Sequence, residues 1–268
     1  MKDLRIVLLG GVVVGVILFF LSAPHLAIAD KVAHQSALAP ADIPAYITAA
    51  VNSPDRPASD KERDASRQPA QVMAFFGLKP GMQVADLWAA GGNTTELLAR
   101  IVGPSGRVYS QNPPFPDKFK DAEKAWQARM KEPGMANLIE VPRAFDDPAL
   151  IPAPPGSLDL VIVNLNYHDM VGQKFDRARI NAAVFKALKP GGVYAIVDNS
   201  AQAGSGARDA DTLHRIDEQF EVKEISDAGF RLTADSDVLR NPKDDRTLPF
   251  WKVDHKQDRF ILKFVKPE

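Results

Sequence analysis

The strongest constraint on the fold is a series of short apolar strands that alternate with helical segments along most of the chain. The stretch Leu-Val-Ile-Val at residues 160–163 is apolar at every position, which is typical of a parallel strand covered by helices on both faces. Strands are expected at residues 84–87, 107–111, 137–141, 158–164 and 193–197, with helical stretches at 117–131 and 173–187. This alternation predicts an α/β fold with a doubly wound, mostly parallel sheet.

Two copies of Leu-Lys-Pro-Gly, at residues 78–81 and 188–191, each separate a helical segment from an apolar strand. Pro-Gly ends a helix and turns the chain, so both copies mark helix-to-strand joints. Before the first joint we expect helices at residues 43–51 and 60–76. After the second we expect a helix at 220–228, a strand at 230–238 and a last strand at 259–265 that closes the sheet antiparallel.

The N-terminus carries the pattern of an export signal. Lys2 and Arg5 precede an apolar run at residues 6–21, and Ala-Ile-Ala at 27–29 is typical of a signal-peptidase site. We predict a signal peptide over residues 1–29 or, if it is uncleaved, an N-terminal anchor. The predicted location is periplasmic or secreted, with anchoring to the inner membrane as the alternative, and contact with a membrane only through this segment. Residues 30–53 are expected to form a tether and a first helix, and residues 54–268 the main domain.

Composition narrows the class of partner. The chain of 268 residues is 45% hydrophobic, enough for one sizeable core, and has 33 basic against 34 acidic residues. A balanced charge argues against nucleic acid and favours a small molecule or another protein as partner. The absence of cysteine excludes disulfides, thiolate nucleophiles and cysteine-type zinc sites.

The turn after the first main strand is the first candidate binding site. Gly91 and Gly92 permit close approach of the backbone to a ligand, and Asn93 with Glu96 is expected to form a capping box. Free N–H groups at the start of this helix favour a carboxylate or phosphate. Asp86, at the strand end, either anchors the loop or accepts from a ligand ammonium group, and a tight connection without any ligand is the alternative.

Trp88 and Ala90 occupy the first two places where such a turn usually has glycine. A tryptophan does not readily adopt positive φ, as glycine does at this place. Its indole either stacks beside a cofactor or fills the cofactor's space.

Several motifs resemble those of one family. They are Leu-Lys-Pro-Gly-Met-Gln-Val-Ala-Asp at residues 78–86, the glycine turn, Ser-Leu-Asp-Leu-Val at 157–161, Asn-Leu-Asn-Tyr-His-Asp at 164–169, Leu-Lys-Pro-Gly-Gly-Val-Tyr at 188–194, Thr-Leu-His-Arg-Ile-Asp at 212–217 and Asp-Arg-Phe-Ile-Leu-Lys at 258–263. With them the chain, from about residue 54 to 266, resembles the class I S-adenosylmethionine-dependent methyltransferases, and most closely the exported methyltransferases of bacteria. The resemblance implies a seven-stranded Rossmann-like sheet with N-terminal helices.

The resemblance also implies S-adenosylmethionine as cofactor and assigns residues to it. Asp86, Trp88 and the turn from Ala89 to Gly92 would face its methionine half. The pair Gln111-Asn112 stands where the family usually offers an acid to the ribose hydroxyls, with Gln111 assigned to the cofactor. Asp146 or Asp147 matches the acid that contacts the adenine amine, although an acid beside Pro148 is as easily a turn former.

The exit of the fourth main strand is the candidate acceptor site, with Asn164, Tyr167, His168 and Asp169 as the proposed catalytic residues. Asn164 and Tyr167 have the spacing of the Asn-Pro-Pro-Tyr element of amino-group methyltransferases, but both prolines are missing. We expect His168, held by Asp169, to be the general base. The alternative is that Asp169 caps the next helix and His168 is a polar loop residue.

No residue is assigned as a metal ligand, but one hard-cation site is considered. In metal-dependent O-methyltransferases an Asp-Asn pair like Asp198-Asn199 holds magnesium or calcium together with an acid, for which Asp169 is the match. The alternative is that Asn199 begins a turn. Four further polar residues either reach a cleft or remain on polar helix faces. They are His214 and Arg215, which follow a flexible loop, and Arg56 and Arg67 in the charged N-terminal region.

The predicted function is therefore S-adenosylmethionine-dependent methyl transfer to an unidentified small-molecule or protein acceptor outside the cytoplasm. The chain lacks the Gly-x-Gly-x-x-Gly run of NAD-dependent oxidoreductases and the Gly-x-Ser-x-Gly elbow of serine hydrolases. The alternative is a non-catalytic methyltransferase fold that binds a metabolite or a partner protein.

Overall fold

The computed structural model describes residues 31–117 and 120–268, and these form one compact unit. The predicted signal segment, residues 1–29, lies outside the described residues. Within the described ranges, no helix has the length and apolar character needed to cross a membrane.

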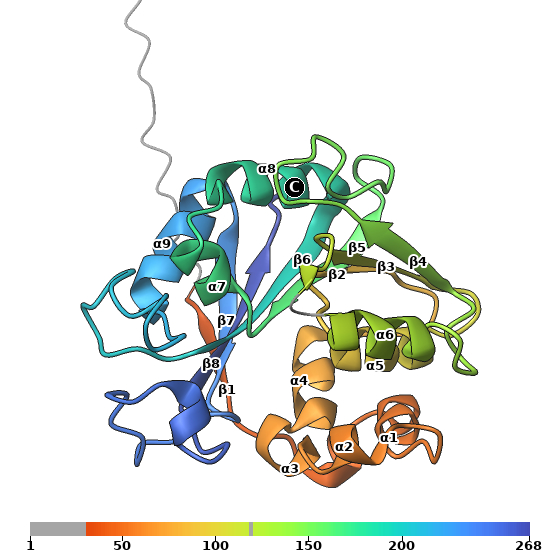
Figure 1. Cartoon of the computed structure of the whole chain (residues 1–268), viewed down its shortest axis with the longest axis horizontal. Helices are drawn as coiled ribbons and strands as arrows, with labels where there is room; N and C mark the ends of the chain where they lie inside the picture. The colour runs from red at the N-terminus through yellow and green to blue at the C-terminus, as the bar shows by residue number, and fades with distance from the viewer. Residues whose placement is uncertain (1–30, 118–119) are drawn as a thin grey trace, which may run out of the picture. The chain divides into compact units, whose positions relative to one another are not determined.

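A mixed sheet of eight strands forms the centre of this unit, in the order β1-β7-β8-β6-β5-β2-β3-β4 (Figure 1). All strand pairs are parallel except those of β8 with β6 and with β7. The strands are β1 (Ala33–Gln35), β2 (Gln83–Leu87), β3 (Arg107–Asn112), β4 (Leu138–Pro142), β5 (Leu158–Asn164), β6 (Leu188–Asn199), β7 (Arg231–Ser236) and β8 (Arg259–Val265). The predicted doubly wound fold is confirmed, including the antiparallel last strand.

The helices cover both faces of the sheet, and they are α1 (Ala45–Val51), α2 (Ala58–Lys61), α3 (Asp64–Arg67), α4 (Pro69–Phe76), α5 (Asn93–Val102), α6 (Lys120–Arg129), α7 (Tyr167–Gly172), α8 (Arg177–Ala187) and α9 (Glu218–Asp227), with the 3-10 helices η1 (Pro40–Asp42) and η3 (Phe250–Lys252). One apolar cluster joins the sheet to α7, α8 and α9, and the other joins it to α1, α4 and α5 (Figure 1). Alternate residues of β2 and β5 enter the two clusters, as with Val161 in one and Ile162 in the other. This is why these strands are apolar on both faces.

Two expectations about the elements are wrong, and one helix was not expected. The prediction of a tether is wrong for residues 33–35, because these pair with β7 as β1 and give the sheet an eighth strand in place of the expected seven. The helix expected at residues 60–76 is broken into α2, α3 and α4. The break before α4 falls at Gln68, which has φ +43° and precedes Pro69, and proline disfavours helical geometry in the residue before it. The short helix α7 was not predicted.

Strand order reverses between β2 and β5. From β2 the chain proceeds outward through β3 and β4, and then returns to β5 on the other side of β2. In open α/β sheets the ligand site lies outside the carboxyl ends of the strands at such a point.

Candidate functional site

Two adjoining cavities lie at the carboxyl ends of β2 and β5. The first cavity, of about 530 Å³, is bordered by the β2–α5 loop, the start of α7 and η3. The second cavity, of about 620 Å³, extends from the same loop toward the end of β3. Six residues line both: Trp88, Ala90, Gly91, Asn166, Asp169 and His214. Both volumes are in the range of small-molecule and cofactor sites.

The β2–α5 loop (residues 88–92) adopts left-handed backbone conformations at Trp88 (φ +57°), Ala90 (φ +50°) and Gly92 (φ +80°). Side chains from β3 hold this geometry: the Trp88 amide donates to Gln111 Oε1 at 3.0 Å, and the Ala90 amide donates to Asn112 Oδ1 at 2.7 Å. Trp88 thus does adopt positive φ, and hydrogen bonds from β3 stabilise this strained conformation.

Gly92 cannot be replaced without disruption. A Cβ atom at this position would lie 2.4 Å from the side chain of Trp126, and positive φ already disfavours other residues. Gly92, and not Asn93, is the N-cap of α5, and no side chain caps this helix. The predicted capping box is wrong, because Glu96 forms ion pairs with Arg100 and Arg129 instead.

The Trp88 indole packs against Phe145 and Phe175, with ring centroids 5.1 and 6.0 Å away. Trp88 also lines both cavities. The two alternatives for its indole, beside a cofactor or in the cofactor's space, stay predictions.

Asp86 lines the first cavity from the end of β2 and is 2% exposed. Its Oδ2 accepts a hydrogen bond from Thr95 Oγ1 at 2.6 Å. Burial raises the pKa of this carboxyl to about 7, against the opposing effect of the hydrogen bonds from Thr95. Asp86 can therefore change charge near neutral pH while it faces the cavity.

Arg67 lies across the first cavity, near the start of α5, and its guanidinium Nη1 donates to Asn93 Oδ1 at 3.1 Å. Burial, and then repulsion from Arg63, lowers its pKa. Among residues 31–117 and 120–268 no carboxylate lies within ion-pair distance of Arg67. A mostly buried cation beside the uncapped N–H groups of a helix favours an anionic ligand group. Arg56, in contrast, is paired with Asp64 and does not reach the cavity.

His168 stands at the start of α7 and is 1% exposed. Its Nδ1 lies 2.5 Å from Asp198 Oδ1, and its backbone amide donates to Asp198 Oδ2 at 2.8 Å. Burial by itself would lower the pKa of His168, but attraction and hydrogen bonding to Asp198 raise it above its ordinary value. The expectation that Asp169 holds His168 is wrong, because the orienting partner is Asp198.

Asp169 and His214 complete a group that we call the His–Asp–His cluster (His168, Asp169 and His214). Asp169 Oδ1 lies 2.7 Å from His214 Nδ1, and Asp169 Oδ2 lies 3.5 Å from His168 Nε2. The magnesium or calcium site expected from Asp169, Asp198 and Asn199 is not assembled. Asp198 is fully buried, and its oxygens accept from His168 and from the Asn199 amide.

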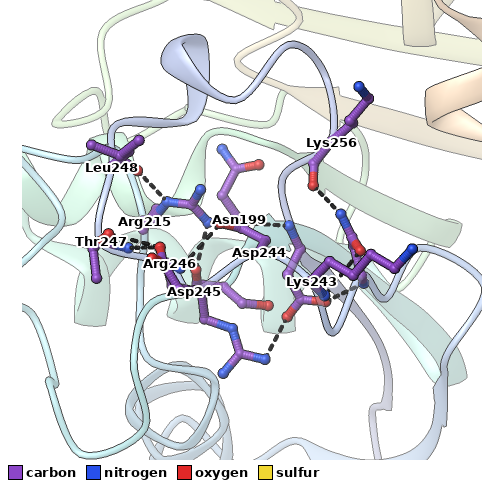
Figure 2. A network of polar contacts seen from close by, with 12 residues as sticks. Asn199, Arg215, Lys243, Asp244, Asp245, Arg246, Thr247, Leu248 and Lys256 are labelled. Carbon is purple, nitrogen blue, oxygen red and sulfur yellow. Dashed lines mark hydrogen bonds and ion pairs between the residues drawn. The ribbon is translucent and has the colours of Figure 1, made fainter.

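His214 is positioned by its neighbours along the chain. Arg215 is fully buried, pairs with Asp244 at 2.8 Å and donates to the Leu248 carbonyl, as Figure 2 shows. These contacts hold the segment that leads to η3, whose Phe250 and Trp251 rings pack against His214. Arg215 is thus a structural residue, whereas His214 faces both cavities.

The remaining predicted site residues divide into two groups. Asn164 lines the first cavity and donates to Thr94 Oγ1, and Ala89 and Gly91 also line it. Tyr167 is completely buried on the α8 and α9 side, where its hydroxyl donates to Glu224 and accepts from Asn181. The catalytic assignment of Tyr167 is therefore wrong, since successive helical residues point about 100° apart.

The predicted adenosine contacts also need correction. Both polar ends of the Gln111 side chain are occupied, by the Trp88 amide and the Arg143 carbonyl, so it supports the loop instead of facing a ligand. Asp147 accepts from the Ala149 amide as a turn former, Asp146 is exposed, and neither lines the two cavities.

Asn112 and Asn166 also line the cavities. Asn112, the second residue of the expected Gln111-Asn112 pair, lines the second cavity. Asn166 lines both cavities and donates to the Trp88 carbonyl at 2.8 Å. Asn166 had no predicted role, although it lies within the Asn-Leu-Asn-Tyr-His-Asp motif at residues 164–169.

Comparisons with known proteins agree with this fold. No family model matches the chain. The chain is 22% identical over 161 residues to the ubiquinone/menaquinone biosynthesis C-methyltransferase UbiE of Shewanella halifaxensis, covering 60% of this chain and 57% of that protein. It is 26% identical over 169 residues to the same enzyme of Ectopseudomonas mendocina, covering 63% and 59%. The chain thus spans less than two thirds of the length of these relatives.

Solved structures show the same architecture. A methyltransferase from Aquifex aeolicus described as dependent on S-adenosylmethionine superposes with a TM-score of 0.57 at 19% identity, over 81% of this chain and 96% of the other. The [4+2]-cyclase SpnF superposes with a TM-score of 0.56 at 15% identity, over 78% and 82%. The fold is that of the class I methyltransferases.

Proposed function

We propose that this protein transfers a methyl group from S-adenosylmethionine to an acceptor held between its two cavities. The observation that carries the proposal is the pair of adjoining cavities at the β2–β5 switch point, which meet at the strained β2–α5 loop of a methyltransferase fold. The relatives that this chain matches are C-methyltransferases by their descriptions.

The residues of the first cavity fit the amino-acid end of this cofactor. Asp86 can accept from an ammonium group, while Arg67 and the N-terminus of α5 supply positive charge for a carboxylate. The β2–α5 loop would lie along the middle of the cofactor, with the Trp88 indole beside it. Asn112 and the Pro-Pro-Phe-Pro stretch at residues 113–116 offer the second cavity to the adenosine part. Of the pair Gln111-Asn112, Asn112 is then the residue that contacts the cofactor.

S-adenosylmethionine supplies a methyl group that is already activated by its sulfonium charge. The protein then has to orient the acceptor and, for a hydroxyl or amine, remove its proton. His168 lines the first cavity and Asp198 holds its Nδ1, which leaves Nε2 as the ring nitrogen to take the proton. General-base catalysis of this kind contributes about 10²- to 10⁴-fold. A carboxylate that orients the imidazole and stabilises its cation acts as a positioning group.

The same proposal places the activity outside the cytoplasm. Its support is the sequence pattern of residues 1–29, and the acceptor is then a small molecule or protein of that compartment. The hard-cation site is not carried forward, because the oxygen ligands expected for it do not meet.

Calorimetric titration with S-adenosylmethionine and with its demethylated product tests the proposal. We expect one equivalent of each to bind. Trp88→Gly keeps the backbone conformation available and should weaken binding about fivefold through loss of about 1 kcal/mol of stacking. Trp88→Phe, which retains an aromatic ring, should recover most of the affinity.

Two outcomes would contradict this proposal. Binding that appears only in Trp88→Gly would mean that the indole plugs the site, which supports the non-catalytic alternative. The solved structures that share this fold also include a [4+2]-cyclase, so the fold by itself does not require methyl transfer. An affinity unchanged in Trp88→Gly would place the cofactor elsewhere.

A further inference from the structure

We propose that the His–Asp–His cluster binds a divalent first-row transition-metal ion, such as Zn²⁺, Fe²⁺ or Co²⁺. One ligand atom from each of His168, Asp169 and His214 lies within 4.8 Å of the others. Two imidazole nitrogens and one carboxylate oxygen are a common ligand set for catalytic zinc and for non-haem iron. The nitrogen donors distinguish this site from the magnesium or calcium site considered from the sequence, since those ions prefer oxygen ligands.

An independent observation points to a missing ligand at this place. His168 is 1% exposed, and its buried Nε2 has no hydrogen-bond partner in the part of the chain that the structure describes. Buried polar atoms are nearly always hydrogen-bonded, and leaving one unpaired is costly. The nearest acid, Asp169, lies 3.5 Å away, beyond a good hydrogen bond. An ion coordinated by Nε2 would satisfy this atom.

Asp198 prepares His168 for this role. The Asp198 carboxylate accepts a hydrogen bond from His168 Nδ1, which keeps the proton on that nitrogen. The lone pair of Nε2 then points toward Asp169 and His214. A carboxylate behind a metal-binding histidine is the usual supporting arrangement, because it fixes the tautomer and makes the imidazole a better donor. Asp198 itself is fully buried and is fixed by the His168 and Asn199 amides as well.

The cluster is open to the cavities on its remaining side. All three residues line the first cavity, and Asp169 and His214 also line the second. Three protein ligands with free positions toward a cavity are typical of catalytic metal sites, whereas structural sites are closed by four protein ligands. A bound ion would therefore be accessible to a small molecule in either cavity.

Metal binding as such does not depend on the proposed methyl transfer, but its consequence for the mechanism rests on it. A divalent ion at this position would lower the pKa of an acceptor hydroxyl and would use the lone pair of His168 Nε2. The two roles of Nε2, ligand and general base, exclude each other. Methyl transfer that stops on chelation and returns with the ion would assign the ligand role.

The test uses the full chain without a histidine tag, stripped with a chelator and then titrated with Co²⁺ and Zn²⁺. We expect one equivalent of Co²⁺ per chain with visible absorption typical of low-coordinate cobalt, and competition by Zn²⁺. His214→Ala removes a ligand that is 34% exposed in its side chain, so the fold should persist. This variant should lose at least 10²-fold in affinity, and Asp198→Asn should lose 10- to 100-fold.

His255→Ala is the matched control, since His255 is exposed and lies outside the cluster, and it should bind like the unmodified chain. The same samples are titrated with S-adenosylmethionine, so that the metal site and the cofactor site are judged separately. Cobalt binding without cofactor binding would leave the metal site standing and reject the proposed function. No tight cobalt binding, or cobalt binding that is unchanged in His214→Ala, would overturn the metal site.

Discussion

Asp86 carries a buried carboxyl group that accepts a hydrogen bond from the hydroxyl of Thr95. Because burial raises its pKa to about 7, the group is protonated in the folded protein at pH values where it would be ionised in the unfolded chain. Its contribution to stability is therefore present at pH 4 and is lost as the pH rises through about 7. A ligand ammonium would reverse this preference, since it pairs only with the ionised carboxylate.

As the pH rises toward 7, we expect the affinity for S-adenosylmethionine to increase about tenfold per pH unit. Above pH 7 the affinity should no longer depend on pH. Asp86→Asn should bind weakly with no such dependence, and Asp147→Asn, outside both cavities, should keep the normal profile. Calorimetry between pH 5.5 and 8 measures this. A pH-independent affinity in the unmodified protein would show that Asp86 does not contact the ligand ammonium.

At the scale of elements, α9 contains an uncompensated acid. Glu221 is fully buried, and neither of its carboxyl oxygens has a hydrogen-bond partner among the described residues. Burial, and then repulsion from Asp198, raises its pKa well above the ordinary value. Glu224, one turn further on, is instead satisfied by Arg177 and Tyr167.

Glu221→Met should therefore stabilise the protein by about 1–3 kcal/mol at pH 8. At this pH the folded protein must either keep the Glu221 carboxyl protonated or bury its negative charge, and the free-energy cost of both is largest there. The sign follows from linkage: a raised pKa gives stability at low pH that is lost as pH rises, so the gain should shrink toward pH 5. Thermal unfolding measures the difference. The matched variant Glu224→Met should destabilise, because it leaves Arg177 without its partner. A destabilised Glu221→Met would mean that the acid has a partner in solution.

For the whole molecule, the predicted cleavage point lies just before the compact unit. Cleavage after Ala29 would leave a chain that begins at Asp30 and retains all of the unit Lys31–Glu268, including β1. Strand β1 is tied to β7 by the Ser236 hydroxyl, which donates to the Gln35 carbonyl at 2.6 Å. The stretch between the predicted cleavage point and β1 is therefore much shorter than the tether that we expected.

Mass spectrometry of the exported protein should give a mature N-terminus at Asp30. An intact N-terminus in the membrane fraction would indicate the uncleaved anchor instead. A fusion of residues 1–35 to a reporter that is active only after export provides the control, and activity confined to a cytoplasmic reporter would reject export.

Local patterns in the sequence determined the layers of this protein. Three patterns predicted elements correctly: the apolar run of β5, the two Pro-Gly joints and the strand Arg259–Val265. Each pattern arises from interactions with near neighbours in the chain or from burial on both faces. Such signals are periodic and short in range. They also located the loop after β2, with Asp86, Trp88 and Gly92, because ligand sites of this fold lie at strand ends. Strand β1 was missed since three residues at a sheet edge carry little periodicity.

Only the tertiary structure decided what each side chain at the strand ends does. Tyr167 and His168 are adjacent in the sequence, yet their side chains lie in different places. The Tyr167 hydroxyl is buried against α9, whereas His168 lines the first cavity. The partner of His168 is Asp198, 30 positions away, because parallel strands bring their carboxyl ends together. Gln111 became a support for Trp88 for the same reason. Direction and partnership across the sheet depend on packing between distant segments, which the order of residues along the chain does not record.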